Sequence, residues 1–231
     1  MKRFYKAATA QEVDGGWQVM LDSRGMKTVK GSPQIVPSEA LAEALADEWA
    51  RQGEEIDPKS FVFRDMADYA IDIVAPDVAA KADELTAYGD TDTLLYRADP
   101  DQPLYPRQLE VWEPIVTAFE AREGVKMTRV SGILHRPQAP EALAKLRAKL
   151  SGQSPFALAG LETMTTLAAS LIIGLSSMEP ETDAEALWNA ASLEEDWQAD
   201  LWGRDEEAEE RRAKRQAGFL RAREFTRLSQ P

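Results

Sequence analysis

The sequence predicts an α+β protein, in which a small N-terminal β-meander of barrel-like character precedes a larger and mostly α-helical domain. Two observations indicate this. Up to residue 37, turn residues separate short segments in which apolar and polar side chains alternate, as in half-buried strands. From residue 38 onward, apolar residues recur at steps of three and four, as on one face of a helix. We therefore expect a β unit at residues 1–37 with a helix at 38–53 packed on it, followed by a helical domain at 54–231.

Short strands are expected in the β unit at residues 3–6, 17–21 and 26–30. Gly15 and Gly16 separate the first two segments, and residues 22–25, Asp-Ser-Arg-Gly, predict a hairpin turn before the third. This arrangement is typical of an antiparallel meander.

The first helix has the clearest sequence pattern. Ser38 is a suitable N-cap, because its hydroxyl can accept a hydrogen bond from an unpaired backbone N–H of the first turn. Leu41, Leu45 and Trp49 then follow at steps of four along one face. Gly53 is expected to end the helix.

Two segments rich in proline, at 98–106 and 136–140, interrupt the helical domain and predict loops. Thr182 and Glu185 predict a capping box at the start of the helix that follows them. In chain order, helices are expected at 61–75, 77–88, 108–123, 141–150, 155–176, 183–201 and 205–225.

Charge and composition exclude several classes of function. The 40 acidic residues outnumber the 27 basic ones, and the net charge of −13 argues against binding to duplex nucleic acid or to an anionic membrane surface. Because the chain has no cysteine, disulfides, thiolate catalysis and iron–sulfur clusters are excluded. No Walker loop or dinucleotide-binding glycine motif occurs. We therefore expect neither a cofactor nor a metal site.

The N-terminus has neither the apolar stretch of a secretion signal nor the Arg-rich helix of a transit peptide. The longest uncharged apolar stretch, residues 163–178, is shorter than the roughly 20 residues that a membrane-spanning helix needs. We expect this stretch to be a buried helix and the protein to be cytoplasmic, without direct membrane insertion.

Two patterns could carry chemistry, and each has a plainer interpretation. Asp90 and Asp92 have the Asp-x-Asp spacing by which haloacid-dehalogenase-type phosphatases hold a nucleophile and a general acid beside magnesium. In those enzymes the motif follows a buried strand, which is missing here, so capping and turn formation are favoured. His135, with Ser131 four residues earlier, is the only histidine. A structural or surface role is favoured over a catalytic one.

An acidic stretch at residues 181–200 contains seven Asp or Glu residues and no Lys or Arg. Four of its acids are expected near the C-terminal end of the helix at 183–201, where the helix dipole disfavours negative charge: Glu194, Glu195, Asp196 and Asp200. Stability alone does not explain acids there, so the stretch is either a docking surface or simply solvated. The final helix, by contrast, is expected to balance its charges through Glu207–Arg211 and Glu210–Lys214 pairs.

Four tryptophans lie in or beside the predicted helices of residues 54–231. Trp112 and Trp188 are expected in the core, because large aromatic side chains dominate burial in helical domains. Trp197 and Trp202 flank acidic residues just before Gly203, a helix stop, so at least one of them is expected near the surface.

The segment 193–203, Leu-Glu-Glu-Asp-Trp-Gln-Ala-Asp-Leu-Trp-Gly, resembles a motif of the assembly chaperones of the F-type ATP synthase, in the family that receives the α subunit of the F₁ sector. Further matches lie at 3–6 (Arg-Phe-Tyr-Lys), at 21–24, at Glu48-Trp49 and at 91–97 (Thr-Asp-Thr-Leu-Leu-Tyr-Arg), so the resemblance spans nearly the whole chain. Since no transit peptide is recognised, the resemblance is expected to be to the bacterial branch of this family.

The resemblance implies a molecular chaperone without enzymatic activity that binds the unassembled α subunit and prevents its aggregation until the β subunit replaces it. It also implies that segment 91–97 carries no catalysis. A family-important acid carries over to Glu194, with Glu195 as its neighbouring alternative, and Trp49 carries over as a folding residue. Gln198, Trp202 and Gly203 complete the expected partner-binding patch.

One departure from the family pattern is visible, since residues 168–171 read Ala-Ala-Ser-Leu where Gly-Ser-Leu is common. It affects the expected helix packing at that point. Two other functions stay open from the sequence: a magnesium-dependent phosphatase that uses Asp90 and Asp92, and a helical adaptor for another partner.

Overall fold

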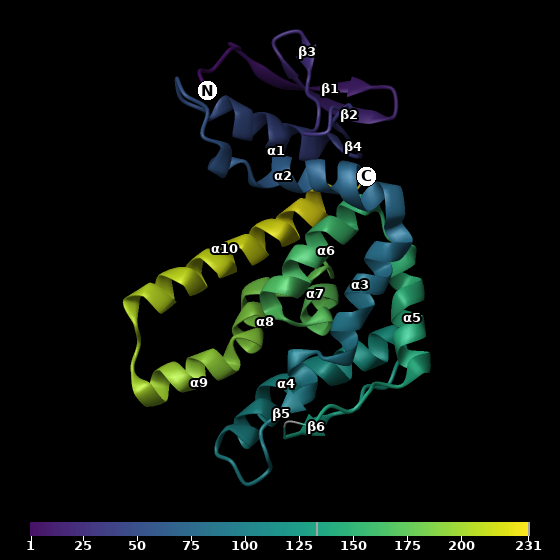
Figure 1. The fold of residues 1–231 in the computed structure, drawn as a ribbon, viewed down its shortest axis with the longest axis vertical. Coiled ribbons are helices and arrows are strands. Elements are labelled where there is room, and N and C mark those ends of the chain that lie inside the picture. The colour runs from purple at the N-terminus through teal and green to yellow at the C-terminus, as the bar shows by residue number, and fades with distance from the viewer. Residues whose placement is uncertain (133, 231) are drawn as a thin grey trace. The chain divides into compact units, whose positions relative to one another are not determined.

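The computed structural model describes residues 1–132 and 134–230 (Figure 1). A small N-terminal antiparallel sheet is followed by helices, which confirms the predicted α+β class. The chain divides into two compact units: the first holds Met1–Val78, Ser154–Gly160 and the residues from Glu224 onward, and the second holds Ala79–Gln153 and Leu161–Arg223. The domain boundary that the sequence suggests after residue 53 stays a prediction.

The sheet of the first unit consists of β1 (Ala8–Val13), β2 (Gly16–Leu21), β3 (Arg24–Gly25) and β4 (Ile35–Val36). β2 pairs antiparallel with each of the others, in a β1–β2 register that places Ala8 opposite Leu21. The predicted strand at 17–21 is confirmed, and the turn before β3 is made by Asp22, whose φ of 54° lies in the left-handed region.

Two of the expected strands are wrong. Residues 3–6 lie before β1, because the N-terminal segment hydrogen-bonds to residues 54–56 instead: Arg3 N donates to Glu54 O, and Ile56 N donates to Met1 O. The strand expected at 26–30 is replaced by a loop. There Thr28 N donates to Ser32 O, and the Asp72 carboxylate accepts from the Thr28 hydroxyl at 2.8 Å. The loop geometry therefore overrides the alternating pattern.

Helix α1 (Glu39–Ala50) packs against β1 and β2. The predicted N-cap is confirmed, since Ser38 Oγ accepts a hydrogen bond from Leu41 N at 3.1 Å. Leu41, Leu45 and Trp49 are buried on the inner face of the helix. The helical region that follows comprises η1 (Pro58–Ser60), α2 (Val62–Tyr69), the π-helix η2 (Ala70–Val74) and η3 (Ala75–Asp77).

The second unit is helical apart from a short parallel pair of strands, β5 and β6. In chain order the remaining elements are α3 (Val78–Asp90), η4 (Thr93–Leu95), β5 (Tyr96–Arg97), α4 (Leu104–Glu123), β6 (Val130–Ser131), α5 (Pro140–Ser151), α6 (Pro155–Ala168), α7 (Leu171–Ser177), α8 (Ala184–Ala191), α9 (Leu193–Trp202) and α10 (Glu206–Leu228). α4 begins earlier than expected, because Pro106 lies in its first turn, where a helix needs no N–H donor.

The helix expected at 155–176 is two helices, α6 and α7, because the backbone turns at Ala169 with a φ of 48°. Ser170 then caps α7, its hydroxyl accepting from Ile173 N at 3.0 Å. Thr93, in a different part of the chain, stabilises the turn at Ala169, because its N and Oγ1 donate to Ala169 O at 3.1 and 2.8 Å. Both helices are largely buried, as expected for this apolar stretch. Across the described chain, no helix is long and apolar enough to cross a membrane.

The helix expected at 183–201 is also two helices, α8 and α9, which meet at Ser192. Trp112 Nε1 donates to Ala190 O at 2.7 Å, and this carbonyl would accept from the N–H of residue 194 in a continuous helix. The predicted capping box of Thr182 is wrong as well. Asp183 is the N-cap of α8, and its carboxylate accepts from two backbone N–H groups of the first turn, at 2.9 and 3.0 Å.

Candidate functional site

The expected patch lies on α9, and the break at Ser192 changes its electrostatics. Glu194, Glu195 and Asp196 occupy the first turn of α9 rather than the end of a longer helix. At a helix N-terminus the dipole stabilises negative charge. The predicted conflict between these three acids and the helix dipole is therefore wrong.

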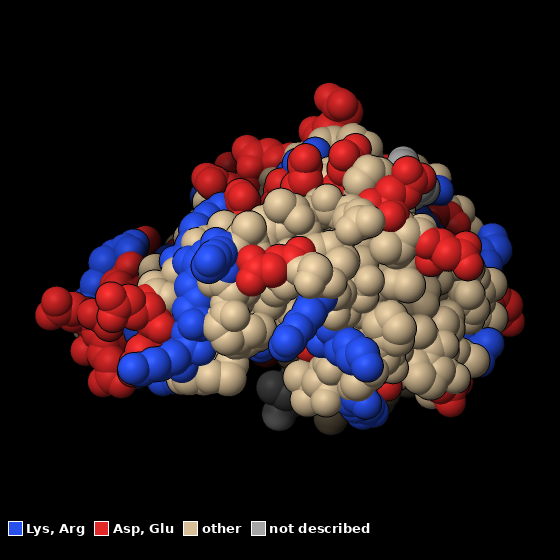
Figure 2. Space-filling view, turned by 90° about the horizontal axis from the view of Figure 1, so that it is seen from above, with Lys and Arg blue, Asp and Glu red and all other residues tan. Residues whose placement is uncertain are grey.

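Most acids of α9 also have basic partners. Asp196 forms a bidentate ion pair with Arg212 of α10, one arm at 2.7 Å, and Glu195 pairs with Arg215 at 2.6 Å. Asp200 pairs with Arg204 at 3.2 Å. At the left edge of Figure 2, the edge on which α9 and α10 lie in Figure 1, acidic and basic side chains lie side by side. The pairs of Asp196 and Glu195 connect α9 with α10, whereas Arg204 lies in the loop between the two helices.

The final helix contributes to this neutralisation in addition to balancing itself. The predicted pairs are confirmed, Glu207 with Arg211 at 2.5 Å and Glu210 with Lys214 at 3.8 Å. The arginines that α9 uses, Arg212 and Arg215, lie 16 and 20 positions beyond their acidic partners. Interpreting the acidic stretch as uncompensated is therefore wrong for Glu195 and Asp196, because sequence spacing alone does not show pairing between helices.

Glu194 differs from its neighbours. Its Oε1 accepts a hydrogen bond of 2.6 Å from Nε2 of Gln108, a fully buried side chain on α4. Within the described residues, no Lys or Arg nitrogen lies within ion-pair distance of this carboxylate. Burial raises the pKa of Glu194, and the hydrogen bond from Gln108 opposes part of the rise. Glu194 is thus a half-buried acid without a cationic partner, a state that costs free energy unless a partner supplies the charge.

Glu194, Gln198 and Trp202 recur at steps of four and share one face of α9, with Leu201 beside Trp202. We call these four residues the α9 stripe. Leu201 is 60% exposed and Trp202 is 79% exposed, so two large apolar side chains face solvent at the helix end. Gly203, with a φ of 97°, ends α9 there. The stripe therefore runs from an unpaired carboxylate to an exposed apolar tip over roughly 12 Å of helix.

Several grooves adjoin α9 in the described part of the chain. A groove of about 680 Å³ has apolar lining from Val111 of α4 and from Leu193 and Trp197 of α9. Arg107, Arg204 and Arg212 and the acids Asp196 and Asp200 also line it. A smaller groove of about 210 Å³ lies between α9 and α10, and Trp202 forms part of its wall.

The tryptophans fall largely as expected. Trp112 and Trp188 are buried in the core of the second unit, Trp197 is half-buried, and Trp202 is exposed. In the first unit Trp49 is buried, and its ring contacts Tyr5 with a centroid separation of 5.6 Å. This burial is compatible with the folding role expected of Trp49, which stays a prediction.

Segment 91–97 has a structural role in which Asp92 is central. Asp92 is fully buried, and its carboxylate accepts from Leu94 N at 3.0 Å, from Ser170 Oγ at 2.7 Å and from Ile172 N at 2.9 Å. It thereby caps η4 and the start of α7. Burial raises the pKa of Asp92 to about 6, against the lowering effect of these hydrogen bonds. A carboxylate occupied in this way cannot serve as a solvent-facing general acid or nucleophile, so capping is the better interpretation.

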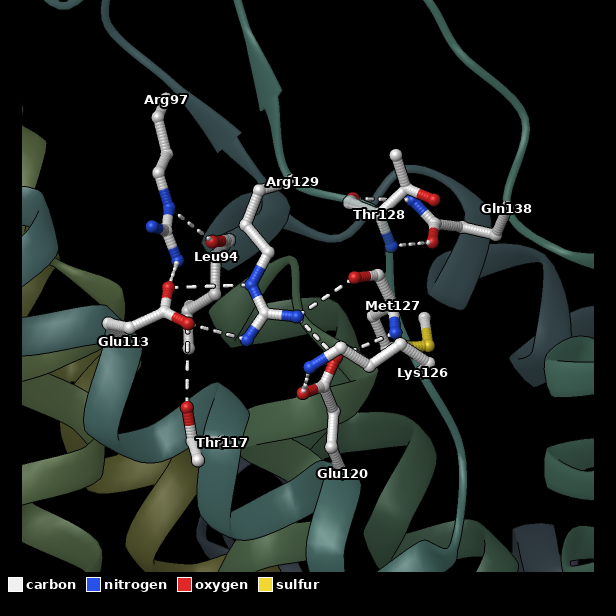
Figure 3. Close-up of polar contacts among 10 residues, drawn as sticks. All are labelled: Leu94, Arg97, Glu113, Thr117, Glu120, Lys126, Met127, Thr128, Arg129 and Gln138. Atoms are coloured by element: carbon white, nitrogen blue, oxygen red, sulfur yellow. Dashed lines mark hydrogen bonds and ion pairs between the residues drawn. The ribbon is translucent and has the colours of Figure 1, made fainter.

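The other end of the segment joins β5 to α4 (Figure 3). Arg97, which is buried, lies with Nη2 at 2.6 Å from Glu113 Oε2. Arg129 pairs with Glu113 at 2.7 Å and also with Glu120, which lies about two turns further along α4. Burial alone would raise the pKa values of Glu113 and Glu120, but the arginine hydrogen bonds outweigh it and lower both. The network fixes the two short strands on the helix.

His135 is exposed and satisfied by neighbours, as the plainer interpretation predicts. Its Nδ1 lies 2.8 Å from the Tyr96 hydroxyl, and its Nε2 lies 3.4 Å from Asp90 Oδ2. The other oxygen of Asp90 accepts from Gln138 N at 2.7 Å. No group of three or more His, Asp or Glu residues that could hold a metal ion occurs among residues 1–132 and 134–230.

The structure thus brings Glu194, Gln198 and Trp202 onto one face, with Gly203 at its end, and directs Glu195 toward α10. Gln108 was not predicted as a site residue, and only its long-range contact with Glu194 identifies it.

Comparisons with known proteins agree on one family. A sequence model described as ATP12 chaperone protein matches residues 2–120. The mitochondrial protein atp12 of Schizosaccharomyces pombe is 27% identical over 221 residues, which cover 90% of this chain and 76% of that protein. The crystal structure of Atp12 from Paracoccus denitrificans has a TM-score of 0.94 and 37% identity, covering 99% of this chain and 98% of the Paracoccus chain. A variant of the Paracoccus protein with one aspartate replaced by lysine gives the same TM-score.

Proposed function

The chain belongs to the ATP12 chaperone protein family, and from this premise we propose that it binds the unassembled α subunit of the F₁ sector and prevents its aggregation until the β subunit pairs with it. A chaperone role in ATP synthase assembly follows from the family itself. The choice of the α subunit rests on the motif at residues 193–203. The encounter is expected in the cytoplasm of a bacterium.

The α9 stripe is the observation that carries the proposal. An orphan subunit exposes apolar surface that is normally covered in the assembly, and such surface aggregates. Leu201 and Trp202 offer exposed apolar area to cover it, and the unpaired Glu194 offers a negative charge to a basic side chain beside it. The net charge of −13 also makes complexes repel one another, which favours solubility.

The structure distinguishes the two neighbouring acids. Glu195 is engaged by Arg215 and supports the contact between α9 and α10. Glu194 has a hydrogen bond but no counter-ion within the described residues, so a cation from the client can still pair with it. We therefore assign the direct client contact to Glu194, Gln198 and Trp202, with Gly203 setting the end of the helix, and we assign Glu195 a supporting role.

The α9 stripe is too small to form the whole interface, because stable complexes bury about 1,600 Å² in total. The groove of about 680 Å³ shares Leu193 and Trp197 with α9 and is the adjoining surface of suitable polarity. We propose that it also contacts the client.

The test compares Glu194→Lys with Glu185→Lys, which makes the same charge change at an exposed position of α8. Aggregation of isolated α subunit is followed by light scattering in the presence of each variant, after circular dichroism confirms that each is folded. Glu194→Lys should lose most of the suppression and Glu185→Lys should keep it. If Glu194→Lys does not fold, Glu194→Gln removes the charge with nearly the same shape. Full suppression by a folded Glu194 variant would refute the assignment.

A pull-down from native extract separates the chaperone from a helical adaptor with another client. The proposal requires ATP synthase α subunit among the recovered proteins, and its absence would favour the adaptor.

A further inference from the structure

Gln108 connects three parts of the second unit while remaining fully buried. It lies on α4, its Nε2 donates to Glu194 Oε1 at 2.6 Å, and its Oε1 accepts from Ala98 N at 2.8 Å. The orientation of the amide follows from chemistry, because a backbone N–H can only donate and an ionised carboxylate can only accept. The oxygen must therefore face Ala98, and the NH₂ group must face Glu194.

This arrangement has a direct consequence for Glu194. One carboxylate oxygen is held by an amide that is itself held at its other end, so the side chain cannot rotate freely without breaking a buried hydrogen bond. The second oxygen, Oε2, remains available to a partner. Glu194 therefore presents its carboxylate in one direction before the client arrives, which lowers the entropy cost of binding.

We propose that Gln108 is a positioning residue for client binding, which fixes the direction and the charge of the Glu194 carboxylate without touching the client. The inference rests on the proposed function, because it takes Glu194 as the client contact. A purely structural Gln108, needed only to satisfy Ala98 N, is the competing interpretation. The two differ in what the side chain must offer to Glu194.

The variant Gln108→Glu distinguishes them, because a carboxylate still accepts from Ala98 N but cannot donate to Glu194 when ionised. Two carboxylates at this distance share one proton, and the pair then titrates as a unit. With one proton shared, the new side chain can donate to Glu194 much as the amide does. With none, the two charges repel and Glu194 turns away. The variant should bind well near pH 5.5 and poorly near pH 8.

Wild type should show the opposite trend. Burial raises the pKa of Glu194, and no charged neighbour within the described residues contributes to this shift, which Gln108 alone partly offsets. Lowering the pH protonates Glu194 and removes the charge that the client uses. Affinity of wild type should therefore fall as the pH falls, whereas that of Gln108→Glu should fall as the pH rises.

The experiment measures the dissociation constant for isolated F₁ α subunit at pH 5.5, 7 and 8, for wild type, Gln108→Glu and the control Gln102→Glu. Gln102 is exposed in the loop before α4, so its variant adds the same charge without contact to a buried carboxylate. At pH 8 we expect Gln108→Glu to bind about tenfold or more weakly than wild type, with the reversed pH trend. Gln102→Glu should follow the wild-type trend.

Each outcome is decisive. Suppose that wild type binds the α subunit and that Glu194→Gln loses this binding. A wild-type pH profile in folded Gln108→Glu would then overturn the positioning role and leave the proposed function intact. If wild type does not bind the α subunit at all, the proposed function itself fails. If Gln108→Glu does not fold, Gln108→Met removes the donor at similar volume. It should weaken binding most at low pH, and unchanged binding by this folded variant would also overturn the inference.

Discussion

The turn between α6 and α7 yields a quantitative prediction, that Ala169→Gly stabilises the protein. Ala169 has a φ of 48° and takes the position just after the end of α6. Ser170 N donates to Thr165 O at 3.1 Å, and Ala169 N donates to Thr166 O at 3.3 Å. These two bonds define a Schellman motif, in which the left-handed residue is usually glycine. At this position the resemblance led us to expect glycine, and the left-handed backbone gives a physical reason for that expectation.

The magnitude follows from two opposing terms. A left-handed conformation costs an L-residue with a Cβ roughly 1–2 kcal/mol, which glycine does not incur. Glycine in turn lowers the free energy of unfolding by about 0.4–1 kcal/mol, because it gives the unfolded chain more conformational freedom. Ala169 is exposed, so removal of its methyl group sacrifices little burial. The net expectation is a gain of about 0.5–1 kcal/mol, or roughly 1–4 °C in Tm for a chain of this length.

Urea unfolding followed by circular dichroism measures the gain, with Ala217→Gly as the matched control. Ala217 is an exposed position inside α10, where glycine should cost about 1 kcal/mol. The same substitution should therefore have opposite signs at the two positions. If Ala169→Gly destabilises as much as Ala217→Gly does, the backbone at Ala169 is not left-handed in solution and the explanation of the helix break is wrong.

Two further predictions concern buried or half-buried charges. Because the pKa of Asp92 is raised to about 6 on folding, from an unfolded value near 3.9, this group contributes stability that is complete below pH about 4 and is lost as the pH rises through 6. Asp92→Asn should lack that dependence of about 2–3 kcal/mol, as urea midpoints at pH 4.5 and 7.5 would show, and equal pH trends would contradict it. Arg212→Met should cost about 1–2 kcal/mol because it leaves the half-buried Asp196 without its bidentate partner. Arg211→Met, which breaks an exposed pair, should cost under about 0.5 kcal/mol; urea unfolding of both variants measures the two losses, and equal losses would refute the distinction.

Local chemistry determined the parts of the fold that the sequence predicted well. Ser38 caps α1 through a bond to a residue three positions on, and Leu41, Leu45 and Trp49 repeat at the period of one helix. Such signals lie within one element. The same holds for the Glu207–Arg211 pair on α10, where both partners occupy successive turns.

The errors came from contacts between distant parts of the chain. Trp112 donates a hydrogen bond to a carbonyl of α8 that lies 78 positions further along the chain, and Thr93 donates one to the Ala169 carbonyl, 76 positions further. Each bond therefore lies at a break in a helix that the sequence pattern predicts to be continuous. The motif at 193–203 indicated α9 as the candidate site, and this assignment stays a prediction. It could not separate Glu194 from Glu195, because that distinction depends on Gln108 and on Arg215, which belong to other helices.

Contacts with neighbouring segments determine which acids of α9 are paired. Most acids of α9 are neutralised by arginines of α10 and of the loop before it, so net charge does not by itself mark the proposed binding surface. Among the acids of α9, Glu194 alone has no basic partner within the described residues; a buried amide holds it, and it lies on the same helix face as an exposed tryptophan.

Affinity for isolated subunits is the most direct test of the central claim, that the protein receives the α subunit through α9. Immobilised wild type and Glu194→Lys are each presented with purified F₁ α subunit and, separately, with purified β subunit. The account predicts that wild type retains α and not β, that added β releases the bound α, and that folded Glu194→Lys retains little of either. Equal retention of α and β by wild type, or undiminished retention of α by the folded variant, would contradict it.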